Sequence, residues 1–181
     1  EVELMVVAHG TYTVAEAKRF AAMVADCDLA WFEEPVGADD RAGLAEFRAS
    51  TMIPVAVGES ECTRFDFAAL IAARAADILQ PDPAFCGGIT EAMRIAALAS
   101  AFNLRLAPHL WAGAPCFFAG LHVLAAAPAG YIVEFSLGAN PMIHDLSRAP
   151  VVVQDGTIAV PDAPGLGLEM DIEIIARYAR N

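Results

Sequence analysis

The chain has 181 residues, a hydrophobic fraction of 57% and a formal net charge of −12 at pH 7. Its only lysine is Lys18, so it lacks the clustered basic residues that bind a nucleic-acid backbone, and no nucleic-acid partner is expected. No apolar run reaches the roughly 18 to 20 residues that span a membrane, and no basic-then-apolar leader opens the chain. These features predict a soluble, cytoplasmic protein without a membrane partner.

Strands and helices are expected to alternate from the first residues onward. Residues 2–8 read as a short apolar strand, and Thr13 and Glu16 form a capping box that opens a helix ending near residue 25. Further helices are expected at about 41–49, 65–75, 86–101 and 115–127. The strands between and after them end in acids or a histidine, namely Glu33, Glu59, Asp82, His109 and Glu134.

These polar strand ends recur roughly every 25 residues, which is the spacing of successive βα units in a barrel. The carboxyl ends of such strands form one rim of the barrel, where active sites lie. The chain is shorter than the roughly 250 residues of a complete barrel. We therefore expect a partial α/β barrel that brings several carboxylates and one imidazole together.

The last part of the chain departs from this rhythm. Asp155-Gly156 predicts a hairpin turn within residues 151–160, and Asp171 can cap a short final helix. We expect residues 1–149 to form the partial barrel domain and residues 150–181 to form a tail that packs outside it.

Glu33 and Glu59 follow consecutive strands, where they could share one hard divalent cation. Oxygen ligands on rigid strands suit Mg2+, which usually keeps some waters that a substrate can displace. The alternative is that both are solvated loop acids paired with a nearby arginine.

Asp82 and His109 follow the next two strands, so a hydrogen bond between them is reasonable. A carboxylate that orients an imidazole and raises its pKa makes a general base, although a lone histidine is often structural. Glu134 could be a partly buried acid that donates a hydrogen bond to a substrate oxygen when protonated. Trp111 could line a pocket, and Arg64 could meet an anionic substrate or simply a neighbouring acid.

Six motifs occur in an order and spacing that carry a family resemblance. They are Trp31-Phe32-Glu33-Glu34-Pro35, Gly58-Glu59-Ser60, Gln80-Pro81-Asp82, Cys86-Gly87-Gly88-Ile89-Thr90-Glu91, Pro108-His109 and Glu134-Phe135. Over almost the whole chain, the sequence resembles the barrel of the enolase superfamily, mandelate racemase subgroup. The resemblance is greatest to the acid-sugar dehydratases and sugar-lactone cycloisomerases of that subgroup.

The resemblance implies the C-terminal part of a TIM-type (β/α)7β barrel with about six parallel strands and an irregular tail. It assigns Glu33 and Glu59 as the second and third carboxylate ligands of one Mg2+ ion. It assigns Asp82 and His109 as a dyad that moves the proton next to a substrate carboxylate, and Glu134 as the acid that stabilises the enediolate. The implied activity is dehydration or isomerisation of a sugar acid, which would make the protein a lyase or an isomerase.

Two departures from the family pattern leave an alternative open. Val7-Ala8-His9 stands where the family has Asp-x-Asn, so valine replaces the first metal ligand, and His9 is a softer ligand or a substrate contact. The Lys-x-Lys strand, the first barrel strand and the N-terminal capping domain are expected to be absent. The alternative is a non-catalytic or fragmentary relative without a working metal site.

Exposed sheet edges would favour a homo-oligomer.

Overall fold

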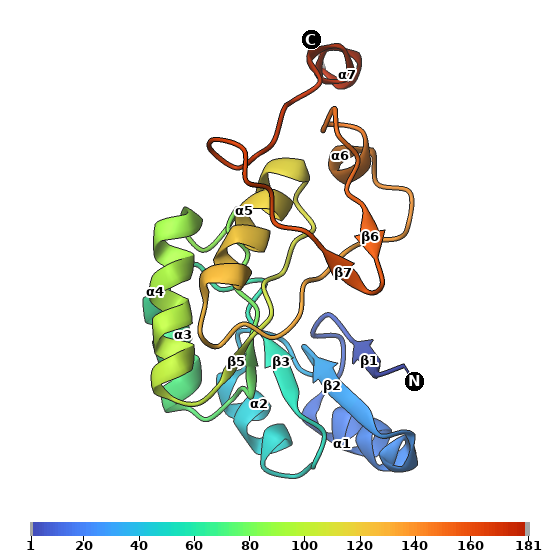
Figure 1. Ribbon diagram of the computed structural model, residues 1–181. Coiled ribbons are helices and arrows are strands. Elements are labelled where there is room, and N and C mark those ends of the chain that lie inside the picture. The colour runs from blue at the N-terminus through green and yellow to red at the C-terminus, as the bar shows by residue number, and fades with distance from the viewer. Residues whose placement is uncertain (1, 180–181) are drawn as a thin grey trace.

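Five short parallel strands form the centre of the protein (Figure 1). The structure is a computed structural model that describes residues 2–179. The strands are β1 (Leu4–Val7), β2 (Leu29–Glu33), β3 (Val55–Val57), β4 (Ile78–Leu79) and β5 (Arg105–Leu106). They pair in sequence order, and each neighbouring pair is parallel. All carboxyl ends therefore meet at one edge of the sheet, as the βα rhythm predicts, and the α/β barrel class is confirmed.

Helices connect the strands and lie around the outside of the sheet (Figure 1). They are α1 (Val14–Met23), the 3-10 turn η1 (Ala25–Cys27), α2 (Arg41–Arg48), α3 (Arg64–Ala72), α4 (Gly88–Ala101) and α5 (Ala114–Ala126). The predicted capping box at α1 is confirmed, because Thr13 Oγ1 accepts from the amide of Glu16 and the Glu16 carboxylate accepts from the amide of Thr13.

The main core lies between the sheet and these helices. Phe32 on β2, Phe47 on α2 and Phe67 on α3 are fully buried in it. The rings of Phe32 and Phe47 meet edge to face at 5.6 Å, a geometry that favours aromatic pairs beyond the area they bury. This packing fixes the helices against the strands and so makes the strand ends a rigid platform.

The sixth expected strand, ending at Glu134, is reduced to a single parallel bridge between Leu106 and Gly130. The amide of Tyr131 still donates to Leu106, but the ladder then stops. Beyond it, the amide of Leu110 donates to the side chain of Glu134 and not to a backbone carbonyl. A side-chain acceptor thus replaces the backbone pairing that would have continued the strand.

The C-terminal segment carries α6 (Pro141–His144), the antiparallel pair β6 (Val153–Gln154) and β7 (Thr157–Ile158), and α7 (Ile172–Tyr178). In Figure 1 this segment extends away from the sheet, with α7 farthest from it. Its apolar side chains, including Leu166 and Leu168, pack with Phe117 and Phe118 of α5. The segment therefore adds a second small core on the carboxyl-end side of the sheet.

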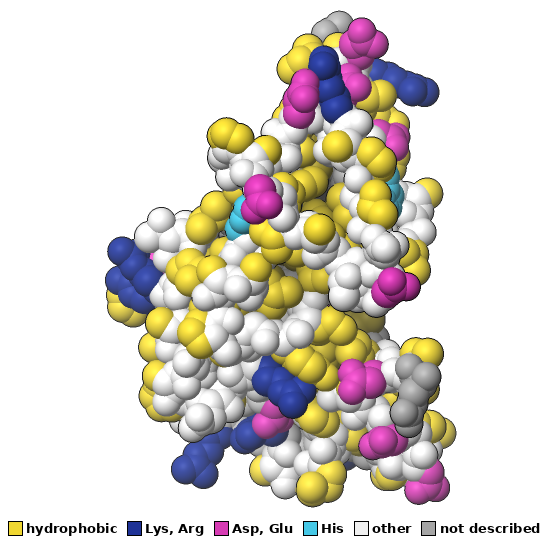
Figure 2. Space-filling model, viewed as in Figure 1, with side chains coloured by type: hydrophobic (Ala, Val, Ile, Leu, Met, Phe, Trp, Pro, Cys, Tyr) yellow, Lys and Arg dark blue, Asp and Glu magenta, His cyan; other side chains and the backbone are white. Residues whose placement is uncertain are grey.

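Among the helices that the structure describes within residues 2–179, none is long and apolar enough to cross a membrane. Hydrophobic side chains cover much of the face shown in Figure 2. The most exposed large ones are Val2, Met23, Met52 and Leu137.

Candidate active site at the strand ends

A cavity of about 930 Å³ opens at the carboxyl ends of the strands. All five polar residues predicted from the strand ends line it, together with His9 and Trp111; the five are Glu33, Glu59, Asp82, His109 and Glu134. Apolar side chains such as Met5 and Trp31 form its floor. Such an apolar floor lowers the local dielectric constant, so interactions between the polar groups are stronger here than at an open surface.

His109 and Asp82 form a close pair in this cavity. The ring nitrogen Nδ1 of His109 lies 2.7 Å from Oδ2 of Asp82, and the Asp82 side chain is fully buried. Burial raises the pKa of Asp82, but its hydrogen bonds to His109 and Cys116 outweigh that effect, and the net pKa is lowered. Asp82 is therefore the ionised acceptor, and Nδ1 of His109 carries the proton that it donates.

Two further donors hold the other oxygen of Asp82. The amide of Ala84 donates to Oδ1 at 2.6 Å, and the thiol of Cys116 donates to it at 3.1 Å. Burial raises the pKa of Cys116 to about 12, and the Asp82 charge adds to the effect, so Cys116 remains a thiol donor at neutral pH. The carboxylate thus has one fixed orientation and presents one oxygen to the imidazole.

The free nitrogen of His109 faces the cavity acids. Nε2 lies 3.7 Å from Oε2 of Glu59. Burial lowers the pKa of His109, but the hydrogen bond to Asp82 and the charges of Glu134 and Glu59 outweigh it, and the net pKa lies above 6.5. An imidazole with a raised pKa in a carboxylate-lined cavity is suited to accept a proton.

Glu33 lies at the end of β2 with one oxygen already bonded. Its Oε2 accepts from Gln80 Nε2 at 2.7 Å and from Trp31 Nε1 at 3.2 Å. Burial raises the pKa of Glu33, and the charges of Glu134 and Glu59 add to this, although the Gln80 hydrogen bond opposes it. The charge of this acid is therefore unfavourable unless a cation or a proton offsets it.

Glu59 occupies the middle of the polar rim, between two histidines. Its Oε1 lies 3.6 Å from Nδ1 of His9, and its other oxygen faces His109. The preceding residue, Gly58, has a φ of +143°, and a Cβ atom there would lie 2.9 Å from the Gln80 backbone nitrogen. Only glycine fits this turn, which directs Glu59 into the cavity.

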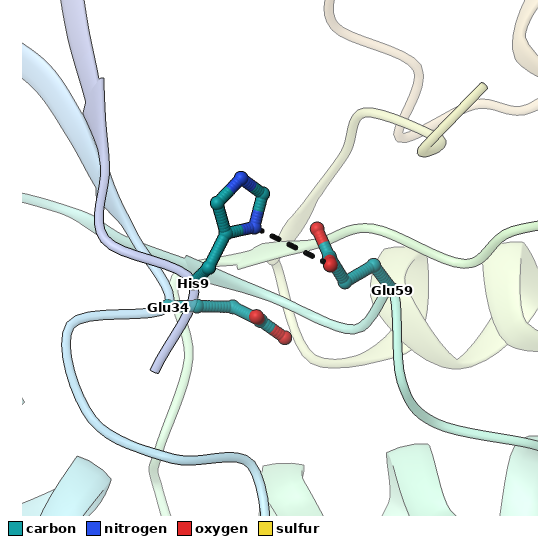
Figure 3. Close-up of side chains that lie close together, drawn as sticks. All are labelled: His9, Glu34 and Glu59. Carbon is teal, nitrogen blue, oxygen red and sulfur yellow. Dashed lines mark ion pairs between the residues drawn. The ribbon is translucent and has the colours of Figure 1, made fainter. Parts of the chain in front are cut away.

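Glu34 is a site residue that the sequence analysis missed. Successive side chains of a strand point to opposite faces, so Glu33 and Glu34 would normally diverge. Glu34 has a φ of +40°, which turns its side chain toward the cavity rim. There it lies with His9 and Glu59 in a group whose candidate ligand atoms are within 4.8 Å of one another (Figure 3). The only signal in the sequence for a role of Glu34 at the site was its position next to Glu33 in Glu33-Glu34-Pro35.

The structure also shows where three other residues of the sequence analysis lie relative to the cavity. Val7 pairs in register with Glu33 and lines the cavity, where it offers no ligand atom. Trp111 lines the cavity and is half exposed. Arg64 does not line it, because its guanidinium is 2.6 Å from a carboxylate oxygen of Glu91. Arg64 therefore pairs with a neighbouring acid, which was one of the two alternatives that the sequence left open, and it does not reach the cavity.

A parallel α/β sheet with acids and a His–Asp pair at its carboxyl-end rim defines part of a TIM-type barrel. Residues 1–174 match the family described as enolase C-terminal domain-like, and the chain belongs to this family. The predicted resemblance to the enolase superfamily, mandelate racemase/muconate lactonizing enzyme group, is confirmed.

Curated relatives agree with this assignment. A D-galactarolactone cycloisomerase of Agrobacterium fabrum is 35% identical, over 98% of this chain and 49% of the relative. A D-galactonate dehydratase of Ralstonia pickettii is 33% identical, over 95% of this chain and 47% of the relative. The chain thus spans about half the length of the curated relatives that it matches.

Solved structures extend the likeness to three dimensions. An enolase from Bradyrhizobium, complexed with magnesium and mandelic acid, superimposes with a TM-score of 0.88 and 32% identity, over 98% of this chain and 46% of that one. A magnesium complex is therefore among the structures that share this fold.

Proposed function

We propose that the protein abstracts a proton next to the carboxylate of a sugar acid, leading through an enediolate to dehydration or isomerisation. The observation that carries this proposal is the hydrogen bond between His109 and the buried Asp82. It leaves Nε2 of His109 as the basic atom that faces the cavity. The activities of two relatives, a sugar-lactone cycloisomerase and a sugar-acid dehydratase, support the same substrate class.

The dyad explains how the proton would move. A neutral His109 takes the substrate proton on Nε2, while Asp82 holds the ring in place and stabilises the positive charge that forms. In a dehydration, the same imidazolium can then donate its proton to the departing β-hydroxyl. Glu134, which accepts a hydrogen bond from the Leu110 amide at 2.7 Å, is proposed to donate a hydrogen bond to the substrate oxygens when it is protonated, and so to stabilise the charge that develops there.

The cavity acids also fit a divalent cation. Oε2 of Glu59 and Oε1 of Glu34 are buried and have no hydrogen-bond partner among the described residues, and two such orphaned oxygens at one rim favour a positive charge between them. The resemblance assigns Mg2+ to Glu33 and Glu59, and we propose that a divalent cation is held at this rim. When bound, such an ion would offset the negative charge that develops on the substrate carboxylate.

Hydrogen exchange at the substrate tests the proposal directly. We would incubate the chain with aldonic acids, aldaric acids and their lactones in D2O, with divalent cation present, and follow loss of the proton next to the carboxylate by NMR. We expect exchange or dehydration for at least one acid, and its loss in His109→Asn. If no acid exchanges with the correctly folded parent chain, the non-catalytic alternative is favoured.

We further propose that the chain forms a homo-oligomer. β1 is an edge strand of the described sheet, and Leu4 at its start and Val2 just before it are exposed. An unpaired edge with exposed apolar side chains favours association. Sedimentation equilibrium at several concentrations tests this, and a single monomeric species throughout would refute it.

A further inference from the structure

We propose that His9, Glu34 and Glu59 form a site for a transition-metal dication such as Zn2+, and that His9 makes this site prefer Zn2+ over Mg2+ more strongly than carboxylates alone would. The site shares Glu59 with the pair Glu33 and Glu59 that the resemblance assigns to Mg2+, but its other two ligands are His9 and Glu34. It requires neither proton transfer by His109 nor a sugar acid, so it stands independently of the proposed reaction.

The three side chains converge on one point from two strand ends and a loop. Nδ1 of His9 is 3.6 Å from Oε1 of Glu59, and the Glu34 side chain reaches toward Glu59 from beneath His9 (Figure 3). All three candidate ligand atoms lie within 4.8 Å of one another. Ligand atoms bound at about 2.1 Å to one ion lie roughly 3 to 4 Å apart, so a small movement completes the set.

Glu34 supplies the independent sign that a ligand belongs here. The residue is only 5% exposed, and its Oε1 is buried without a hydrogen-bond partner among the described residues. Leaving a buried acceptor unsatisfied is costly, and a buried ionised carboxylate is normally paired or coordinated to a metal. Oε2 of Glu59 is likewise buried without a hydrogen-bond partner among the described residues, although it faces Nε2 of His109 at 3.7 Å.

Backbone hydrogen bonds hold His9 beside Glu34. The amide of Ala8 donates to the carbonyl of Glu33, and the amide of Gly10 donates to the carbonyl of Glu34 at 2.8 Å. These two bonds tie the loop after β1 to the loop after β2. The site is therefore assembled by backbone hydrogen bonds, which lowers the cost of ordering the ligands on binding.

Ligand chemistry decides which ion fits. An imidazole nitrogen suits Zn2+ and other transition metals, whereas Mg2+ prefers oxygen ligands only. Val7 contributes no oxygen at the end of β1, so His9 is the group beside the two carboxylates that can complete a three-ligand set. The His9 side chain is 65% exposed, which leaves open coordination positions on the cavity side for water or a substrate oxygen.

Calorimetric titration of the metal-free, untagged chain with ZnCl2 and separately with MgCl2 tests the inference. Any nitrogen-containing site binds Zn2+ well, so the decisive quantity is the change in each affinity on mutation. We expect His9→Ala to lower Zn2+ affinity about 10-fold or more and to leave Mg2+ affinity within about 2-fold. Because His9 is exposed, this variant should fold.

Two further variants sharpen the result. Glu34→Gln should weaken binding of both ions, since it removes a charge and retains the side-chain shape. His144→Ala is the matched control: its imidazole bonds the Gly138 carbonyl outside the cavity, and its loss should leave both affinities unchanged. Co2+ titration provides a second readout, because the visible absorption of the ion reports its ligands.

The inference is overturned if the His9→Ala variant binds Zn2+ as tightly as the parent chain, or if the substitution lowers the Zn2+ and Mg2+ affinities by the same factor. It is also overturned if His144→Ala removes the Zn2+ signal, which would place the ion elsewhere. A chain that binds Zn2+ through His9 but exchanges no sugar-acid proton would support the metal site and refute the proposed reaction, so the two failures are distinguishable.

Discussion

Replacing Glu34 with glutamine should make the metal-free protein more stable at alkaline pH. Burial raises the pKa of Glu34 from 4.5 to about 7, and the charges of Glu59 and Glu33 add to the effect. The folded state thus holds a proton on Glu34 that the unfolded state releases near pH 4.5. As pH rises from 4.5 toward 7, the unfolded chain releases this proton while the folded chain keeps it, so the free energy of unfolding falls until the folded chain also ionises near pH 7.

The size of the effect follows from the displacement of the pKa. At pH 8, where the acid is ionised in both states, the raised pKa of Glu34 lowers the free energy of unfolding by about 3 kcal/mol. At pH 5 it lowers this free energy by about 1 kcal/mol, because the folded chain keeps a proton that the unfolded chain has largely released. Glutamine mimics the protonated acid at every pH and avoids this cost. We therefore expect Glu34→Gln to raise the free energy of unfolding by about 3 kcal/mol at pH 8 and by about 1 kcal/mol at pH 5.

Urea denaturation in the presence of EDTA at both pH values provides the measurement. Glu169→Gln is the control, because Glu169 is exposed and pairs only with Arg148 at the surface; it should change stability by less than about 1 kcal/mol. An equal effect of Glu34→Gln at pH 5 and pH 8 would refute the reasoning, because the unfavourable charge would then not be that of Glu34.

Three further predictions follow from the rim geometry. Asp82→Asn should lower the pKa of His109, since the hydrogen bond between them raises it; NMR titration of the ring protons measures this, and an unchanged pKa would contradict the dyad. Gly58→Ala should cost about 2 kcal/mol or more in urea denaturation, because of its φ of +143° and the crowded backbone; an unchanged midpoint would contradict it. Val7→Asp should raise Mg2+ affinity in calorimetry about 10-fold by adding an oxygen ligand; no gain would show that this position lies outside the metal site.

The fold could be predicted from sequence because two strong local signals agree. Apolar runs that end in a polar residue recur at the βα spacing, and capping residues such as Thr13 and Asp171 mark helix starts. These signals depend on burial and on local hydrogen bonds, which the neighbouring residues determine. The end of the strand ladder at Gly130 could not be predicted, because it depends on the long-range bond from the Leu110 amide to Glu134.

The same distinction applies to the site. Strand ends place Glu33, Glu59, Asp82 and His109 around one cavity because parallel strands bring their carboxyl ends together. Arg64 was ambiguous in the sequence, since its partner Glu91 is 27 residues away on another helix. Nothing in the local pattern distinguishes an arginine that meets a substrate from one that meets a distant acid.

Two residues of the rim, of which only Glu34 was missed in the sequence, share one physical property, a left-handed backbone conformation. His9 and Glu34 have φ values of +48° and +40°, a conformation uncommon for residues other than glycine. Side-chain periodicity assumes regular strand geometry and therefore assigns the wrong direction to a residue in this conformation. Such strained residues concentrate at functional sites, where the surrounding structure compensates for their cost. Here the hydrogen bond from the Gly10 amide to the Glu34 carbonyl contributes to that compensation, because it holds both strained residues at the rim and keeps an imidazole beside the carboxylates there.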